Sequence, residues 1–333
     1  MERLDHFMAR ANAAYYATHD PFRSFTTSPE ISQAFGEILG LWAAVMWKML
    51  GRPDPVLLVE AGPGRGTLMA DALRAIGSVA GPFRAALRLH FIEASPRLQA
   101  VQAERITGAT WHSSLETLPD APFLLLANEF VDALPIRQFV YRGGLWLERF
   151  VQDGRFVECP SNFVPPPSEP AGEDGRGAKG NPIVEVNEPA LAFTRALGTR
   201  LSVHPGAALI VDYGPERTTP GDSLQALGRS GPADPLACPG SADLTAHVDF
   251  AGLATTAREA GATAYGPVPQ GLFLARLGLF QRTDRLAGGL PPAQASRLIE
   301  AARRLAEPNR MGRLFKALAL CSPGGAAPPG FET

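Results

Sequence analysis

The stretch VLLVEAGPGRGTLMADALR, residues 56–74, decides the fold of this chain. A short apolar run typical of a buried strand leads to Glu60, and helix-like sequence begins at Thr67. Between them, glycines stand at alternate positions: Gly62, Gly64 and Gly66. A glycine-rich turn between a strand and a helix lets the backbone approach a ligand, and the helix N-terminus offers amide donors to it. The stretch therefore predicts a nucleotide-like ligand.

The spacing and charge of this turn narrow the choice of ligand. A phosphate-binding P-loop needs a lysine after its last glycine, but Thr67 follows Gly66 here. A dinucleotide fold prefers GxGxxG, whereas this turn reads GxGxG and is preceded by Glu60. That carboxylate repels a pyrophosphate but attracts a cation such as the ammonium of S-adenosylmethionine, which has no phosphate. The turn favours this cofactor, bound by Glu60 and the glycines; the alternative is that it only packs a strand against a helix.

A second acid and a tryptophan extend the predicted cofactor site. The segment LRLHFIEASPRL, residues 87–98, places Glu93 at the end of the next strand, where a carboxylate binds ribose hydroxyls. Trp111 suits stacking against adenine. The alternatives are a solvent-facing carboxylate for Glu93 and a core or half-buried side chain for Trp111.

Polar residues also follow the strand in LLLANEFVDALP, residues 124–135. Asn128 and Glu129 stand at its carboxyl end, where parallel sheets bind ligands, and Asp132 comes one turn later. Two carboxylates can clamp an arginine guanidinium and localise its charge beside a sulfonium. We expect Glu129, Asp132 and Asn128 on the catalytic side, with Asn128 also close to the cofactor. Alternatively, Asn128 or Asp132 caps a short helix.

Strand and helix patterns alternate along most of the chain, which predicts a mostly parallel sheet with helices on both faces. Ser28 with Pro29, or Thr27 with Glu30, can start the first long helix. The expected helices are 29–50, 67–77, 96–104, 188–200, 245–260 and a pair near 284–306, and the expected strands are 56–60, 87–93, 109–112, 122–127, 207–212 and 313–322.

One excursion interrupts this alternation. Residues 137–159 alternate apolar and polar with glycine turns, which predicts an antiparallel meander. Residues 160–182 are rich in proline, glycine and charge and predict a flexible loop. We therefore expect an N-terminal helical segment, 1–54, an α/β domain, 55–322, interrupted at about 137–182, and a disordered tail, 323–333.

Composition excludes several classes of function. The net charge of −2 argues against a nucleic-acid-binding protein. The cysteines are too widely spaced to suggest a metal site: Cys159, Cys238 and Cys321. No stretch reaches the roughly 18–20 apolar residues of a membrane span, and the N-terminus does not resemble a secretory signal. We therefore expect no membrane insertion and a reducing compartment; the sequence does not indicate an oligomeric state.

Several segments together resemble the MidA-like family, which includes the mitochondrial complex I assembly-factor arginine methyltransferase. In chain order they are FTTSPEISQAFGEILGLW, VEAGPGRGTLMADALR, FIEASPRL, ANEFVDALPIRQFV, VDYG, DPLACPGSADLTAHVDF and QGLFLARLGL. The resemblance runs from Tyr15 to Ala319. It implies a class I, Rossmann-like methyltransferase that uses S-adenosylmethionine, with the residues named above at the donor and acceptor sides. Four further residues match family positions: Asp212, Asp243, His247 and Asp249.

The resemblance also implies an acceptor. The family's mitochondrial member makes symmetric dimethylarginine on a core subunit of respiratory complex I, so we expect a protein-arginine methyltransferase with a similar protein substrate. We expect it in the cytoplasm if the chain is bacterial and in the mitochondrial matrix if it is eukaryotic. The alternatives are a small-molecule methyltransferase that uses the same cofactor and a non-catalytic assembly factor that binds it.

Two segments depart from the family pattern. The family has an acid in the glycine-rich segment before the first long helix, where DPFRSFTTSPE is shorter and carries Ser24. The family also has a histidine-rich stretch where this chain reads LGRSGPA, residues 227–233. We expect the first segment to help cover the donor.

Overall fold

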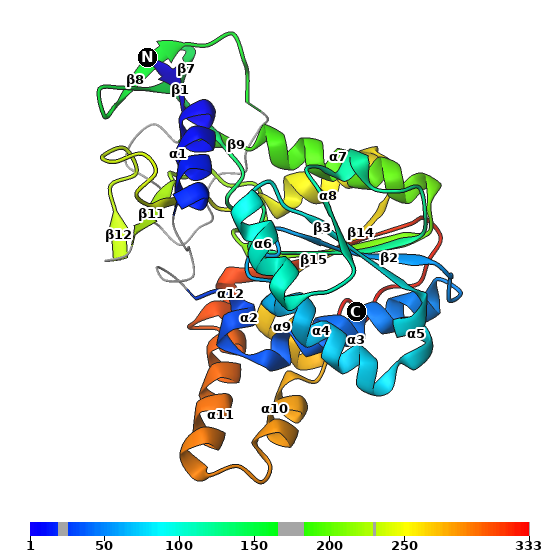
Figure 1. The fold of residues 1–333 in the computed structure, drawn as a ribbon. Coiled ribbons are helices and arrows are strands. Elements are labelled where there is room, and N and C mark those ends of the chain that lie inside the picture. Colours follow the sequence, from blue (N-terminus) through cyan, green and yellow to red (C-terminus); the bar gives the residue numbers. More distant parts are fainter. Residues whose placement is uncertain (19–25, 166–182, 229–230, 333) are drawn as a thin grey trace. The chain divides into compact units, whose positions relative to one another are not determined.

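The computed structural model describes residues 1–18, 26–165, 183–228 and 231–332. The chain forms two compact units (Figure 1). Unit 1 groups Met1–Phe25, Val131–Phe193 and Pro215–Leu253, and unit 2 groups Thr26–Phe130, Thr194–Gly214 and Ala254–Thr333. The expected N-terminal segment, 1–54, is thus divided between the two units. Ser24 lies outside the described residues.

A seven-stranded sheet forms the centre of unit 2, in the order β14-β15-β10-β5-β2-β3-β4. The last five of these strands are parallel, whereas β15 runs antiparallel to both β10 and β14. The bounds are β2 Val56–Ala61, β3 Leu87–Ile92, β4 Ala109–His112, β5 Phe123–Asn128, β10 Gly206–Tyr213, β14 Thr263–Pro269 and β15 Phe315–Cys321. The predicted α/β class with a mostly parallel sheet is confirmed.

Helices cover this sheet because its central strands are apolar on both faces; every residue of β2, β5 and β15 is buried. Side chains of α3, α4, α5 and α9 build the core on one face, and α7 and α8 lie on the other side of the sheet in Figure 1. The helices are α2 Ser28–Ile31, α3 Gln33–Met49, α4 Thr67–Val79, α5 Gly81–Ala86, α6 Pro96–Arg105, α7 Glu188–Val203, α8 Phe250–Glu259, α9 Gln270–Arg276, α10 Leu279–Ala287, α11 Pro292–Ala306 and α12 Met311–Leu314.

The first long helix differs from the prediction at its start. Ser32 is extended, and its hydroxyl accepts a hydrogen bond from the amide of Ala34 at 3.3 Å, so the expected helix 29–50 is split into α2 and α3. Thr27 is the N-cap of α2 but makes no side-chain capping bond, and Ser28 is the first helical residue. Glu30 instead accepts a hydrogen bond from the Thr67 hydroxyl at 2.6 Å. Both predicted capping arrangements are wrong: Ser28 lies inside the helix, and Glu30 bonds to Thr67 rather than back to Thr27.

The end of the chain also differs from the prediction. Phe331 is buried against Phe273, with ring centroids 5.2 Å apart, and the Trp42 indole donates to the carbonyl of Pro329 at 3.2 Å. The expected disordered tail therefore packs into unit 2 over its described residues. The Phe331 ring is buried near the end of a Pro- and Gly-rich segment, and the composition of that segment did not indicate this packing.

Unit 1 contains antiparallel sheets. One has the order β1-β7-β6-β9 with β8 paired to β7, and the other has the order β12-β11-β13. The elements are α1 Leu4–Thr18, β1 Glu2–Arg3, β6 Arg137–Arg142, β7 Leu145–Gln152, β8 Arg155–Pro160, β9 Ile183–Val186, β11 Gln225–Gly228, β12 Gly231–Ala233 and β13 Asp243–Thr245. Most of the expected loop, 166–182, lies outside the described residues, as do residues 229–230 of LGRSGPA.

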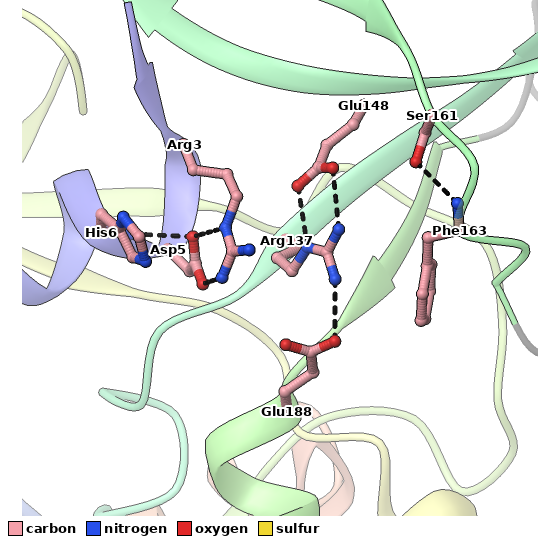
Figure 2. A network of polar contacts seen from close by, with 8 residues as sticks. All are labelled: Arg3, Asp5, His6, Arg137, Glu148, Ser161, Phe163 and Glu188. Atoms are coloured by element: carbon pink, nitrogen blue, oxygen red, sulfur yellow. Dashed lines mark hydrogen bonds and ion pairs between the residues drawn. The ribbon is translucent and has the colours of Figure 1, made fainter.

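A polar network fixes β6 within unit 1 (Figure 2). The Arg137 guanidinium donates to both carboxylate oxygens of Glu148 on β7, each at 2.8 Å, and to Glu188 at the start of α7 at 2.8 Å. It also lies 4.8 Å from the ring centroids of Phe139 and Phe163. These partners satisfy Arg137, so it has a structural role.

Candidate methyl-donor and acceptor sites

The predicted cofactor residues meet at one edge of the unit 2 sheet. Strands β5, β2 and β3 are parallel neighbours whose ends lie in register, since Ala61 pairs with both Ala127 and Ile92. Glu60 is in β2, Glu93 follows β3, and Asn128 ends β5. The sheet therefore brings Glu60, Glu93 and Asn128 to the carboxyl ends of adjacent strands, where open α/β sheets bind ligands.

The glycine turn lies at the same edge. Its three glycines have φ angles of +64°, +55° and +73°, in the left-handed region that favours glycine: Gly62, Gly64 and Gly66. The amide of Gly62 donates to the carbonyl of Ile92 at 3.0 Å. A Cβ at Gly62 would stand 2.7 Å from the Phe130 ring, so both backbone and space require glycine there.

Glu60 is the most strongly perturbed acid of this group. Its side chain is buried, and burial raises its pKa to about 8 against the opposing effect of a backbone hydrogen bond from Met69. Its Oε2 has no hydrogen-bond partner. A cation that binds beside this buried carboxyl favours its ionised form, because the carboxylate and the cation then form an ion pair.

Gln102 links three parts of the predicted cofactor site, namely the glycine turn, Glu93 and Trp111. The sequence pattern did not identify this residue. This fully buried amide on α6 donates to the carbonyl of Gly64 at 2.8 Å and to Oε2 of Glu93 at 3.1 Å. Its oxygen accepts from the Trp111 indole at 2.8 Å. A glutamine within an ordinary helix gives no sequence signal for this role. Trp111 is partly buried and packs against the core; its stacking on adenine stays a prediction.

Glu129 is held in an unusual backbone conformation beyond β5. Its φ is +49°, in the region that non-glycine residues rarely adopt. Oε1 accepts from the backbone amide of Ser28 at 2.7 Å and from the Asn128 side-chain amide at 3.2 Å. Burial raises the pKa of Glu129, while hydrogen bonds from Ser28 and Asn128 and the charge of Arg304 oppose that rise. Ser28, predicted as a possible cap, thus supports a candidate catalytic carboxylate.

Asp132, the second predicted acceptor carboxylate, belongs to unit 1, so its pairing with Glu129 stays a prediction. Asp132 is buried, and its carbonyl accepts from the amide of Ala246 at 2.9 Å. Its charge and that of Asp243 raise the pKa of Tyr16, whose burial has the largest effect. The Tyr16 hydroxyl donates to Asp243 at 2.8 Å, and burial raises the pKa of Asp243 to about 7.

The other family-matched residues have structural contacts. Asp249 accepts from the amide of Gly252 at 3.0 Å and from the Thr218 hydroxyl, and so caps α8. Asp212 is fully buried and accepts from the amides of Phe130 and Tyr213. His247 is exposed, and its backbone amide donates to Ser223.

The sequence suggested neither a metal site nor a membrane span, and the described residues bear on both points. Over 1–18, 26–165, 183–228 and 231–332, the structure has no group of three or more His, Cys, Asp or Glu side chains suited to a metal ion. Within the same residues, no helix is both long and apolar enough to cross a bilayer.

Comparison with known proteins decides the family. A family model described as "Putative S-adenosyl-L-methionine-dependent methyltransferase" matches residues 38–268. The chain belongs to this methyltransferase family. The resemblance to MidA-like methyltransferases is thereby confirmed, and the cofactor is S-adenosyl-L-methionine.

Relatives and solved structures agree with this membership. A Drosophila melanogaster protein named "Protein arginine methyltransferase NDUFAF7 homolog, mitochondrial" is 33% identical over 96% of this chain and 80% of its own length. The Homo sapiens protein named "Protein arginine methyltransferase NDUFAF7, mitochondrial" is 32% identical over 96% and 79%. The crystal structure of a Burkholderia thailandensis protein bound to S-adenosyl-homocysteine has a TM-score of 0.76, with 24% identity over 99% of this chain and 88% of that one. This last likeness concerns the fold.

The residues present fit the cofactor of the family. Two buried oxygens, Oε2 of Glu60 and Oδ1 of Asn128, lack hydrogen-bond partners. The first suits the amino-acid ammonium of the cofactor, and the second suits a polar donor beside it. The glycine turn leaves backbone groups accessible without a Cβ. Geometry and chemistry are therefore compatible with a methyl-donor site at this edge of unit 2.

Proposed function

We propose that this methyltransferase transfers a methyl group to an arginine nitrogen of a protein substrate. The relatives named as protein arginine methyltransferases support this acceptor class. The structural observation that carries it is Glu129: a carboxylate at the end of β5, fixed by the Ser28 amide and able to face a guanidinium.

The chain's residues divide the work between donor and acceptor. In this proposal Glu60 holds the ammonium of the cofactor, Glu93 binds its ribose hydroxyls, and the glycine turn accommodates its amino-acid end. The cofactor supplies an activated methyl on a sulfonium. Glu129, together with Asp132, orients the guanidinium so that one nitrogen lone pair points at that methyl.

Proton transfer accompanies the reaction. When the new N–CH3 bond forms and the S–CH3 bond breaks, the acceptor nitrogen loses one proton. The Glu129 carboxylate is placed to accept it, since burial raises its pKa toward the range in which it can hold a proton. Orientation and exclusion of water supply the rest of the rate enhancement.

We propose a subunit of respiratory complex I, or a similar protein, as the substrate. The site of action is then the compartment that contains this subunit: the cytoplasm in a bacterium and the mitochondrial matrix in a eukaryote. The resemblance to the MidA-like family supports this substrate, and the names of the relatives support an arginine acceptor and a mitochondrial location in eukaryotes.

Incubation of the purified protein with labelled S-adenosylmethionine and a cell extract tests the acceptor class. We expect a labelled protein band whose digest contains dimethylarginine, and no label with Glu129→Gln. Label in small metabolites alone would indicate a small-molecule methyltransferase. Donor binding by calorimetry without product on recombinant complex I subunits would indicate a non-catalytic assembly factor.

A further inference from the structure

The helical hairpin formed by α10 and α11 is basic on a chain that is acidic overall. Residues 279–306, which form the hairpin, contain five arginines and two acids, whereas the whole chain has a net charge of −2. Four of these arginines are exposed: Arg285, Arg297, Arg303 and Arg304. A concentration of one charge sign on one surface attracts a partner of the opposite sign.

The hairpin is firmly attached to unit 2. Leu279 on α10 and Leu305 on α11 are fully buried in the core. Arg282 donates to the buried carboxylate of Glu37 on α3 at 2.6 Å. The connection between the two helices extends away from the sheet in Figure 1. The charged outer face therefore belongs to a rigid element.

Apolar side chains are exposed on the same hairpin. Leu290 and Ile299 are each 39% exposed, and Phe280 is 41% exposed. On α11, Arg297 and Arg304 lie seven residues apart, on the same side of the helix, whereas Ile299, two residues after Arg297, lies on nearly the opposite side. An element that exposes both arginines and apolar side chains is typical of a protein-binding surface.

Helix α11 of this hairpin lies near the proposed acceptor residue Glu129. Helix α11 contacts α2, whose first residue, Ser28, holds Glu129. The guanidinium of Arg304 acts electrostatically on the Glu129 carboxylate. A protein segment that lies along α11 can therefore extend to Glu129 within unit 2.

We propose that the outer face of α10 and α11 binds an acidic, partly apolar segment of the protein substrate beside its target arginine. This inference rests on the proposed function. Acidic flanking residues would pair with Arg285 and Arg297, and their apolar neighbours would cover Leu290. A nucleic acid fits less well, because the hairpin exposes apolar side chains and the acid Glu300 among its arginines.

Peptide binding to the full chain with S-adenosyl-homocysteine tests this surface. The probe is a fluorescent peptide with one central arginine flanked by Glu and Leu; its comparison peptide has Gln in place of each Glu. We expect the Glu peptide to bind more tightly, and Arg285→Glu with Arg297→Glu to weaken its binding about tenfold, as for two exposed charge pairs. The matched control is Arg84→Glu with Arg88→Glu, since both arginines are exposed in unit 2 outside the hairpin. We expect it to weaken binding by less than twofold.

Three results would overturn the proposal. They are equal affinity for the two peptides, equal losses in both double variants, and tighter hairpin-dependent binding to vesicles of anionic phospholipid than to the peptide. Failure of the proposed function is distinct: the peptide would bind through the hairpin, but its arginine would take no label from S-adenosylmethionine.

Discussion

The backbone amide of Ser28 donates to Oε1 of Glu129 across 2.7 Å, although the two residues are 101 positions apart in sequence. The bond joins the start of α2 to the end of β5. It orients the carboxylate of Glu129, a residue whose backbone φ is +49°. Because the donor is a main-chain group, most substitutions of Ser28 leave it in place. The orientation of Glu129 therefore depends on the position of the α2 backbone.

Ser28→Pro removes this donor, and Ser28→Ala keeps it. Proline is tolerated in the first turn of a helix, so we expect Ser28→Pro to fold. A hydrogen bond to a charged group contributes about 1.5–3 kcal/mol, which predicts a loss in kcat of about 10- to 100-fold. We expect Ser28→Ala to stay within about threefold of wild type and both variants to keep their donor Kd. Equal kcat for the two variants would show that the amide does not position Glu129.

Glu129→Gln separates the acceptor role from a donor role. The amide keeps the shape of the side chain but cannot offset a guanidinium charge or take up its proton. We expect a fall in turnover of at least 100-fold, typical of a lost acid–base group, with the affinity for S-adenosyl-homocysteine in calorimetry within about twofold. A large loss of donor affinity would instead place Glu129 on the donor side.

The sequence predicted the placement of those candidate site residues that follow a local pattern. The glycine turn, Glu60 and Asn128 follow apolar strands, and strand ends of a parallel sheet must meet at one edge. The roles of Ser28 and Gln102 were missed because their partners are far away in sequence and become neighbours only when helices pack on the sheet. The same reason explains the split at Ser32 and the packed Phe331. Local capping and composition rules predict the residue types there but not the tertiary partners.

Gln102→Ala tests the amide that links the glycine turn, Glu93 and Trp111. Three hydrogen bonds are lost, and buried groups stay unsatisfied. We expect a donor Kd about tenfold higher and a lower Tm. Gln99→Ala is the matched control, because Gln99 lies on the same helix and its side chain donates to the carbonyl of Glu93. An equal increase in Kd for both variants would contradict the linking role of Gln102.

Glu37→Gln tests the ion pairs that hold the hairpin. Burial raises the pKa of Glu37, but hydrogen bonds and charges from Arg282 and Arg74 outweigh burial, so the pKa lies below 4.5 in the folded state. Such a group stabilises the fold above its unfolded pKa, and this stabilisation is lost as pH falls through the folded pKa. We expect Glu37→Gln to lower the free energy of unfolding by about 2–3 kcal/mol at pH 7, since both arginines are partly exposed.

Denaturant unfolding at several pH values checks this dependence on Glu37. The difference between wild type and Glu37→Gln should shrink as pH falls below about 4.5. Glu104→Gln, at an exposed position on α6, serves as control and should change stability by less than about 0.5 kcal/mol. A difference between wild type and Glu37→Gln that is independent of pH would assign the loss to packing.

The raised pKa of Glu60 predicts that binding of the methyl donor releases a proton. Its folded pKa is about 8 and its ordinary value is 4.5, so between these values the folded carboxyl keeps a proton that the unfolded chain has lost. The stability of the fold therefore falls as pH rises from about 4.5 to about 8 and levels off above about 8. A cationic donor favours the ionised form, so donor affinity should rise with pH, by up to about tenfold per unit, until about pH 8.

Calorimetry at pH 6.5 in buffers of different ionisation enthalpy measures the proton released. We expect about one proton for each S-adenosylmethionine bound by wild type, and none for Glu60→Gln, which should also bind at least tenfold more weakly at pH 8 because its neutral amide cannot pair with the ammonium. The same titration with Glu93→Gln is the control, since this residue is assigned to the neutral ribose hydroxyls and should leave the proton release of Glu60 intact. Unchanged proton release in Glu60→Gln would show that another group ionises on binding and would remove Glu60 from the ammonium site.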